Sequence, residues 1–188
     1  MRLTAALRRF FIGTRIARLS RKGECILTAM NKNTKTLTRA ALIASLYAAL
    51  TLLLQPISYG QIQLRVSEAL TLLPVLLPES IPALAVGCLI ANVLGGCTLL
   101  DIVFGTLATL LAAVCTRLAR KNTWLAAAMP VLFNGIIVGS VVHAAYSPSI
   151  PLFLCMLSVA AGEAVVCFLL GPMVVRMLER LPAQLIRE

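Results

Sequence analysis

The stretch LFLCMLSVAAGEAVVCFLLGPMVVRML, residues 152–178, is apolar over a length that can cross a membrane. A hydrocarbon core about 30 Å thick needs ~20 consecutive apolar residues in a helix. Glu163 lies about 11 residues into the stretch, which places it roughly 17 Å along the helix. An ionisable group at that depth costs at least ~2.5 kcal/mol on insertion scales. We therefore expect Glu163 to contact a ligand; the alternative is a hydrogen-bonded carboxyl that joins helices.

The composition extends this interpretation to the whole chain. Of its 188 residues, 60% are hydrophobic and only 13% are charged, and the mean hydropathy is +0.93. A soluble domain of this size would need more polar surface to cover its core. Before Leu152–Leu178 the sequence has five further apolar segments, which short turns separate: Leu37–Gln55, Ser67–Leu77, Ile81–Gly96, Asp101–Ala119 and Trp124–Tyr146. The sequence predicts an all-α integral membrane protein, a compact bundle of six transmembrane helices.

Charge placement predicts the orientation of this bundle. Sixteen of the 17 Lys and Arg residues fall on one side of a six-span arrangement, and only Arg65 falls on the other. Positively charged loops favour the cytoplasmic side. We expect a multi-pass protein of a prokaryotic cell (cytoplasmic) membrane with both termini in the cytoplasm. The net charge of +10 then faces anionic membrane lipid, and no nucleic-acid partner is expected.

The ends of the chain are assigned separately from the bundle. We expect residues 1–35 to form a basic cytoplasmic leader, residues 36–180 a six-helix transmembrane domain that holds the expected ligand, and residues 181–188 a cytoplasmic tail. The leader has no uninterrupted apolar core of the kind a secretory signal carries. Met30 begins MNKNTKTLTRAAL, which reads as a start directly before the first helix. Whether residues 1–29 are an upstream extension or an amphipathic segment on the inner leaflet stays open.

Four further polar residues lie within or at the ends of the predicted spans. Asn134 and Asn92 lie inside apolar segments, where an amide contacts a ligand or joins helices by a hydrogen bond. Asp101 opens the fourth helix, where an N-cap is the alternative to a binding role. His143, near the outer end of the fifth helix, is a ligand candidate or a satisfied interfacial group. Gly135 and Gly139 form a small-residue pair for close helix packing.

A polar stretch interrupts the apolar pattern between the first two helices. Gln61, Gln63, Arg65 and Glu68 follow one another there, with the only predicted external cation among them. We expect a lid over a pocket that reaches towards Asp101, Asn134 and Glu163. The alternative is a solvated loop closed by an Arg65–Glu68 ion pair, since the two residues are three positions apart.

A stripe of small residues marks the first helix. Ala40, Ala44 and Ala48 recur at a spacing of four, with Ala41, Ser45 and Ala49 beside them. Such a stripe lets another helix approach closely. Docking of a partner protein and packing inside the bundle both remain open.

The sequence lacks the motifs that mark several classes of enzymes and metal sites. The chain has no Walker A loop, HExxH or GxSxG motif, so a non-enzymatic subunit is expected. The six Cys occur singly and without His neighbours, which argues for small buried hydrophobes. We expect no metal site and no cofactor.

Four segments together carry a family resemblance: GQIQLRVSEALTLLP, GCLIANVLGGCTLLDIVFGTLATLLAA, MPVLFNGIIVG and GEAVVCFLLG. From about Asn33 to Met177 the chain resembles the QueT family, substrate-binding S components of energy-coupling factor (ECF) transporters for queuosine precursors. The resemblance implies capture of a 7-deazaguanine-type base outside the cell. It also implies a transmembrane coupling protein, two cytoplasmic ATPases, and docking at Ala40, Ala44 and Ala48. The family does not require the leader.

The candidate residues suit such a base chemically. A carboxylate such as Glu163 accepts from a ring N–H and an exocyclic amine together, while Asn134 or Arg65 donates to the carbonyl. Glu68 or Asp101 would meet a cationic substituent. Three other functions stay open: an S component for another vitamin or nucleobase, an intramembrane enzyme built on Glu163, and a ligand-free structural subunit. The enzyme is disfavoured because no second carboxylate or metal set accompanies Glu163 in the sequence.

Overall fold

The computed structural model describes residues 33–58 and 63–180. The leader up to residue 32, Gln61 of the expected lid, and the tail from residue 181 lie outside the described residues. The chain divides into two compact units, Met1–Thr38 and Arg39–Glu188. Of the first unit only residues 33–38 are described, and they are helical. All other described residues belong to the second unit.

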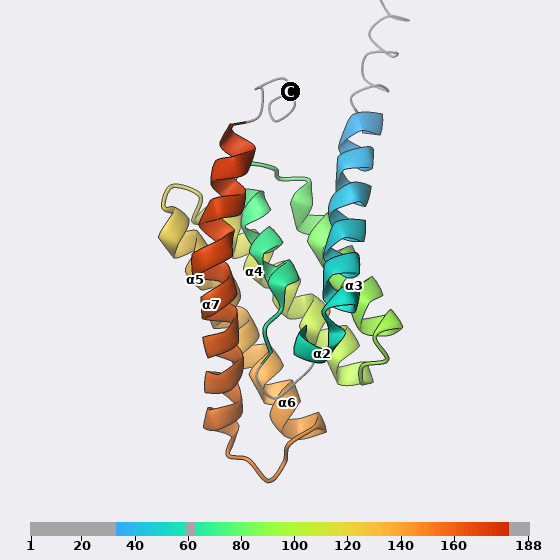
Figure 1. Cartoon of the computed structure of the whole chain (residues 1–188), viewed down its shortest axis with the longest axis vertical. Coiled ribbons are helices and arrows are strands. Elements are labelled where there is room, and N and C mark those ends of the chain that lie inside the picture. Colours follow the sequence, from blue (N-terminus) through green and yellow to red (C-terminus); the bar gives the residue numbers. More distant parts are fainter. Residues whose placement is uncertain (1–32, 59–62, 181–188) are drawn as a thin grey trace, which may run out of the picture. The chain divides into compact units, whose positions relative to one another are not determined.

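Six helical segments follow one another in the described residues, and no strand occurs among them (Figure 1). The first helix spans Asn33–Leu53, and α2, Gln55–Ser58, continues it after a turn. Next come the 3₁₀ helix η1, Val66–Val75, and α3, Ser80–Leu94. The remaining helices are η2 (Asp101–Gly105) with α4 (Thr106–Leu118), α5 (Thr123–Phe133) with η3 (Asn134–Val138) and α6 (Gly139–Ala145), and α7 (Leu152–Glu179).

This architecture confirms the predicted all-α membrane fold. Within residues 33–58 and 63–180, four segments are long and apolar enough to cross a bilayer: Asn33–Leu53, Asp101–Leu118, Thr123–Ala145 and Leu152–Glu179. Large apolar side chains point outward from them, with Leu53 79% and Leu118 78% exposed. Such a surface is stable against lipid and not against water. The shorter segments, η1 and α3, leave the count of six spans a prediction.

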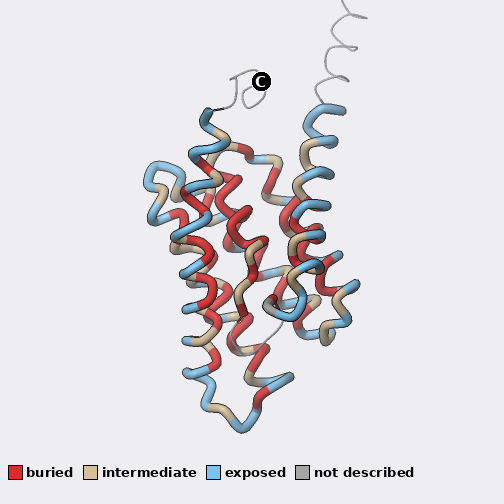
Figure 2. The backbone as a smooth tube through the Cα atoms, viewed as in Figure 1, coloured by how far each residue is buried: buried red, intermediate tan, exposed pale blue. Residues whose placement is uncertain are grey.

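The segment η1 is the buried centre of the unit. Eight of its ten residues are buried, and it packs against α7, α4, α5 and α3. Figure 2 shows η1 as an almost continuous buried stretch between its neighbours. At 2.0 Å per residue it is roughly 20 Å long, too short for a lipid-exposed span. Because protein surrounds it, η1 need not match the thickness of the bilayer.

Arg117 of α4 closes the end of η1. Its Nη1 donates to the carbonyl oxygens of Pro74 at 3.0 Å and Val75 at 2.8 Å. The last carbonyls of a helix have no partner within the helix and need one from elsewhere. Arg117 thus has a structural role besides its contribution to the basic end of the unit, which comprises Arg117, Arg120, Lys121, Arg176 and Arg180.

Small residues set the closest helix contacts. A Cβ atom added to Gly139 would lie 2.5 Å from the Cα atom of Met156, and one on Gly135 would lie 2.9 Å from the Cβ atom of Ala160. Both contacts are with α7, which confirms the predicted packing role of this glycine pair.

The stripe on the first helix divides between two faces. Ala44 and Ala48 are buried, and a Cβ atom on Gly87 of α3 would lie 2.8 Å from the Ala44 carbonyl oxygen. Ala40 is half-buried, whereas Ala41, Ser45 and Ala49 are exposed. The placement of Ala44 and Ala48 agrees with packing inside the bundle, the alternative to partner docking. A docking face on this helix would instead run along Ala41, Ser45 and Ala49.

Candidate ligand-binding site

Six polar side chains from different elements meet in the interior. We call them the polar cluster: Tyr47, Arg65, Glu68, Asn92, Asn134 and Glu163. Each is at most 3% exposed. They come from the first helix, the segment before η1, η1 itself, α3, η3 and α7. Burying this many polar groups in a membrane protein is costly, so their convergence makes the polar cluster a candidate functional site.

Two carboxylates form the centre of the polar cluster. Glu68 Oε1 accepts a hydrogen bond from the Tyr47 hydroxyl, and Glu163 Oε1 accepts one from Asn134 Nδ2 at 3.2 Å. The thiol of Cys167 lies 3.7 Å from Glu163 Oε2. The same thiol lies 3.8 Å from the backbone oxygen of Glu68, so Cys167 adjoins both glutamates. The expected pocket residues Arg65, Glu68, Asn134 and Glu163 are therefore brought together.

Asn92 positions the cation. Arg65 Nη2 donates to Asn92 Oδ1 at 2.6 Å, and Asn92 Nδ2 donates to the backbone oxygen of Asp101 at 3.0 Å. Asn92 thus connects the guanidinium to the start of the fourth helix. This agrees with the alternative that Asn92 joins helices by hydrogen bonds, because both its amide oxygen and its amide nitrogen are engaged.

Burial excludes the solvated-loop alternative for the described part of the expected lid. Gln63 is 5% exposed and Arg65 is 3% exposed. A Cβ atom on Gly162 of α7 would lie 2.1 Å from the Gln63 carbonyl oxygen, so this segment is pressed onto α7 directly before Glu163. Only a glycine allows the backbone to come this close.

Two π-helical turns lie at the polar cluster. Asn134 is the first residue of η3, and Gly105, the last of η2, faces the Asn92 side chain. The two turns also pack against each other. Single π turns inside α-helices occur frequently at functional sites. They shift the side chains that follow them, which a regular helical pattern in the sequence does not reveal.

The polar cluster has unused acceptors. Gln63 Oε1, Glu68 Oε2 and Asn134 Oδ1 are buried and have no hydrogen-bond partner. Asn134 and Thr109 lie near Glu68, but neither makes a hydrogen bond of good geometry to its Oε2. A buried polar atom without a partner costs about 1–3 kcal/mol. The arrangement is suited to a ligand that brings several N–H donors.

Asp101 and His143 contact neighbouring segments at the α6 end of the unit. Asp101 Oδ2 accepts from Thr98 Oγ1 at 3.0 Å and from the Tyr146 hydroxyl. Leu99 and Leu100, directly before η2, are already helical and Leu100 occupies the N-cap position, so the N-cap alternative for Asp101 is wrong. Partial burial, followed by the hydrogen bond to Asp101, raises the pKa of the Tyr146 phenol above its usual value. His143 Nδ1 contacts the Ile150 carbonyl oxygen at 2.8 Å, which agrees with the interfacial alternative.

Comparison with known proteins identifies the family. The sequence profile of the QueT transporter family matches residues 37–180. The chain belongs to the QueT transporter family. The Queuosine precursor transporter QueT of Lactococcus lactis subsp. cremoris (strain MG1363) is 41% identical over 83 residues, which cover 42% of this chain and 48% of that protein. The match thus spans about half the length of this curated relative. No solved structure matches the chain.

Three residues of this candidate site were missed by sequence reasoning. Tyr47 donates to Glu68, and its signal was a single tyrosine in an alanine-rich helix. Cys88 and Cys167 are buried, as predicted, but their sulfur atoms also contact polar groups of the candidate site. The same prediction is wrong for Cys97 and Cys115, which are only partly buried. Among the described residues no group of three or more His, Cys, Asp or Glu side chains is arranged to hold a metal.

The contact at Gly162 gives a first prediction. Gly162→Ala places a Cβ atom against backbone, which cannot rotate away, so the Gln63–Arg65 segment must move. We expect a loss of about 1–3 kcal/mol of stability, the usual cost of overpacking, seen as a lower melting temperature of the purified protein. Ala161→Leu, on the exposed neighbouring position of α7, is the matched control and should melt like the parent. Equal melting of both variants and the parent would contradict the close approach.

Proposed function

We propose that this chain is the substrate-binding S component of an ECF importer. Its ligand is a queuosine precursor, a 7-deazaguanine-type base, bound at the polar cluster. The observation that carries the proposal is the set of buried, unused acceptors around one guanidinium. The name of the Lactococcus relative and membership of the QueT transporter family support it.

The donor and acceptor pattern of the polar cluster suits the edge of such a base. Glu163 and Glu68 accept from a ring N–H and an exocyclic amine, and each carboxylate oxygen has lone pairs for more than one donor. Asn134 gives its N–H to Glu163 and presents Oδ1 as a further acceptor. Arg65 then donates to the carbonyl of the base. In this assignment Asn92 and Tyr47 orient Arg65 and Glu68.

The rival functions fare differently. An S component for another vitamin or nucleobase shares this architecture, and only a ligand measurement separates the two. The expected lack of a second carboxylate beside Glu163, which counted against an enzyme, is wrong because Glu68 supplies one. The preference for transport over catalysis therefore depends on membership of the QueT family. A ligand-free structural subunit leaves the unused acceptors of Glu68 and Asn134 unexplained.

The assembly follows from the same proposal. A transmembrane coupling protein and two cytoplasmic ATPases supply the driving force, and the chain itself hydrolyses no ATP and holds no cofactor. The basic end, with Arg120 and Lys121, faces the cytoplasm of a prokaryotic cell. The coupling protein docks along Ala41, Ser45 and Ala49, which are small and exposed.

Replacing Glu163 tests the ligand site. Glu163→Gln keeps the shape but turns one acceptor into a donor, so two donors face each other in a dry site. We expect a cost of about 2–4 kcal/mol, or roughly 30- to 1000-fold weaker binding of a 7-deazaguanine base in calorimetry. Arg65→Lys should weaken binding at least tenfold, because Arg65 is buried and a lysine cannot reproduce its planar donor set.

Glu179→Gln is the control, since Glu179 is an exposed carboxylate near the basic end of the same helix. It should bind the base like the parent. If Glu163→Gln binds as tightly as the parent and only melts at a lower temperature, Glu163 joins helices and the ligand binds elsewhere.

Single cysteines test the orientation. In a cysteine-free background, Ser149→Cys and Lys121→Cys place thiols at exposed positions near opposite ends of the bundle. An impermeant thiol reagent added to intact cells should label position 149 and leave position 121 unlabelled until the cells are opened. The reverse pattern would overturn the assignment of the basic end to the cytoplasm.

Bulk on the exposed stripe tests the docking face. Ser45→Trp should keep the coupling protein from close approach, lowering its co-purification and substrate uptake about tenfold or more, while ligand affinity stays unchanged. Leu169→Trp, on a 69% exposed position of α7, is the matched control for tryptophan on a lipid-facing surface. Normal complex formation by Ser45→Trp would show that the stripe is not part of the docking interface.

A further inference from the structure

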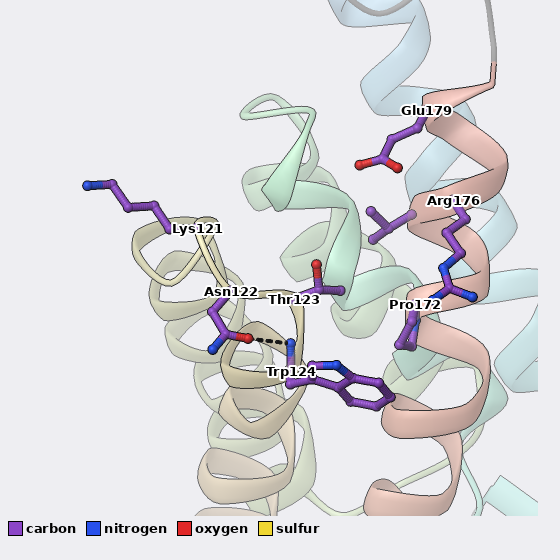
Figure 3. A pocket seen from close by; sticks show the side chains of 8 residues that line it. Lys121, Asn122, Thr123, Trp124, Pro172, Arg176 and Glu179 are labelled. Atoms are coloured by element: carbon purple, nitrogen blue, oxygen red, sulfur yellow. Dashed lines mark hydrogen bonds between the residues drawn. The ribbon is translucent and has the colours of Figure 1, made fainter.

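Two adjoining hollows follow the line where α5 and η3 meet α7. At the basic end, a pocket of about 340 Å³ is lined mainly by polar side chains, among them Lys121, Asn122, Thr123, Trp124, Arg176 and Glu179 (Figure 3). Further along the same helices, a groove of about 540 Å³ is lined by apolar side chains, among them Met129, Leu132, Ile136, Met156, Leu157 and Phe168. Neither hollow includes a residue of the polar cluster.

An aromatic pair joins the two hollows. Trp124 lines the polar pocket, Phe168 lines the apolar groove, and their rings stack with centroids 6.2 Å apart and planes at 24°. Trp124 is 59% exposed. Tryptophan prefers the level where the hydrocarbon core meets the headgroups. The pair therefore lies where a lipid changes from polar to apolar.

The polar pocket favours an anion. Lys121 and Arg176 supply two positive charges against the single negative charge of Glu179. In Figure 3 Arg176 and Glu179 project from α7 above the Trp124 indole, and the Lys121 side chain lies across from them and points away from them. The oxygen of Asn122 is engaged by the backbone N–H groups of Trp124 and Leu125, which leaves its amide donor for another partner.

We propose that these two hollows bind one anionic phospholipid, with its phosphate in the pocket and an acyl chain in the groove. Basic pockets between transmembrane helices on the cytoplasmic side bind anionic headgroups. A free phosphate would leave the groove empty, and an apolar partner helix would leave the excess positive charge of Lys121 and Arg176 over Glu179 unneutralised. An amphipathic anion satisfies both hollows at once. The inference does not depend on the ligand of the polar cluster.

The test uses the purified full chain in lipid nanodiscs. The probes are phosphatidylglycerol, which is anionic, and phosphatidylcholine, which is not. Because a ligand bound only by the folded state raises stability by mass action, phosphatidylglycerol should raise the melting temperature by about 3 °C or more over phosphatidylcholine. Native mass spectrometry should show one phosphatidylglycerol retained per protein.

Two variants localise the effect. Lys121→Gln combined with Arg176→Gln should abolish the difference between the two lipids and melt like the parent in phosphatidylcholine. Ala128→Phe, which fills the groove, should also release the retained lipid. The controls are Arg180→Gln and Leu169→Phe, neither of which lines a hollow; both should keep the difference.

Three results would overturn the proposal. The parent could melt alike in both lipids, the double glutamine variant could keep the full difference, or inorganic phosphate alone in phosphatidylcholine nanodiscs could reproduce the shift. The last result would assign the pocket to a free anion and leave the groove without a lipid.

Discussion

Two carboxylates and one guanidinium are buried between helices that otherwise face lipid, and the rest of the structure accommodates this constraint. No water of the bilayer interior can satisfy such groups, so each must meet protein or ligand. Removing one member of a buried charged group typically costs ~3–5 kcal/mol. Glu68 can be carried by a short, non-α segment only because α3, α4, α5 and α7 surround η1 and separate it from hydrocarbon.

The length and boundaries of the helices could be predicted from the sequence because apolar runs and turn residues determine them. The expected span Leu152–Leu178 corresponds to α7, Leu152–Glu179, and the expected span Asp101–Ala119 to Asp101–Leu118. The 3₁₀ geometry of η1 could not be predicted. Its apolar pattern is compatible with any buried helix, and the tighter winding is stabilised by neighbours such as Arg117, far away in the sequence.

The candidate site, like the fold, could be predicted only in part. Depth within an apolar run singled out Glu163 and Asn134, because only a strong compensating interaction tolerates such residues there. Tyr47 and Cys167 gave no comparable signal, since both residue types are common in apolar helices. The side of the first helix that faces inward was also undetermined. The first helix has two adjacent stripes of small residues. Because the stripes are equally small, no side chain in the sequence shows which of them packs inward: Ala40, Ala44 and Ala48, or Ala41, Ser45 and Ala49.

The π turn at Asn134–Val138 has a consequence for how this scaffold tolerates length changes. A π turn closes over one residue more than an α turn, and each residue of an α-helix turns the chain by about 100°. The wider π turn absorbs its extra residue within about the same rotation as an α turn, so a one-residue deletion within Asn134–Val138 would leave an unbroken α-helix and keep the orientation of α6 relative to α5. The close contact of Gly139 with Met156 and the hydrogen bond from Tyr146 to Asp101 would then remain. A deletion at this turn should therefore be better tolerated than a deletion elsewhere in the same helix, where each residue removed rotates everything that follows by about 100°.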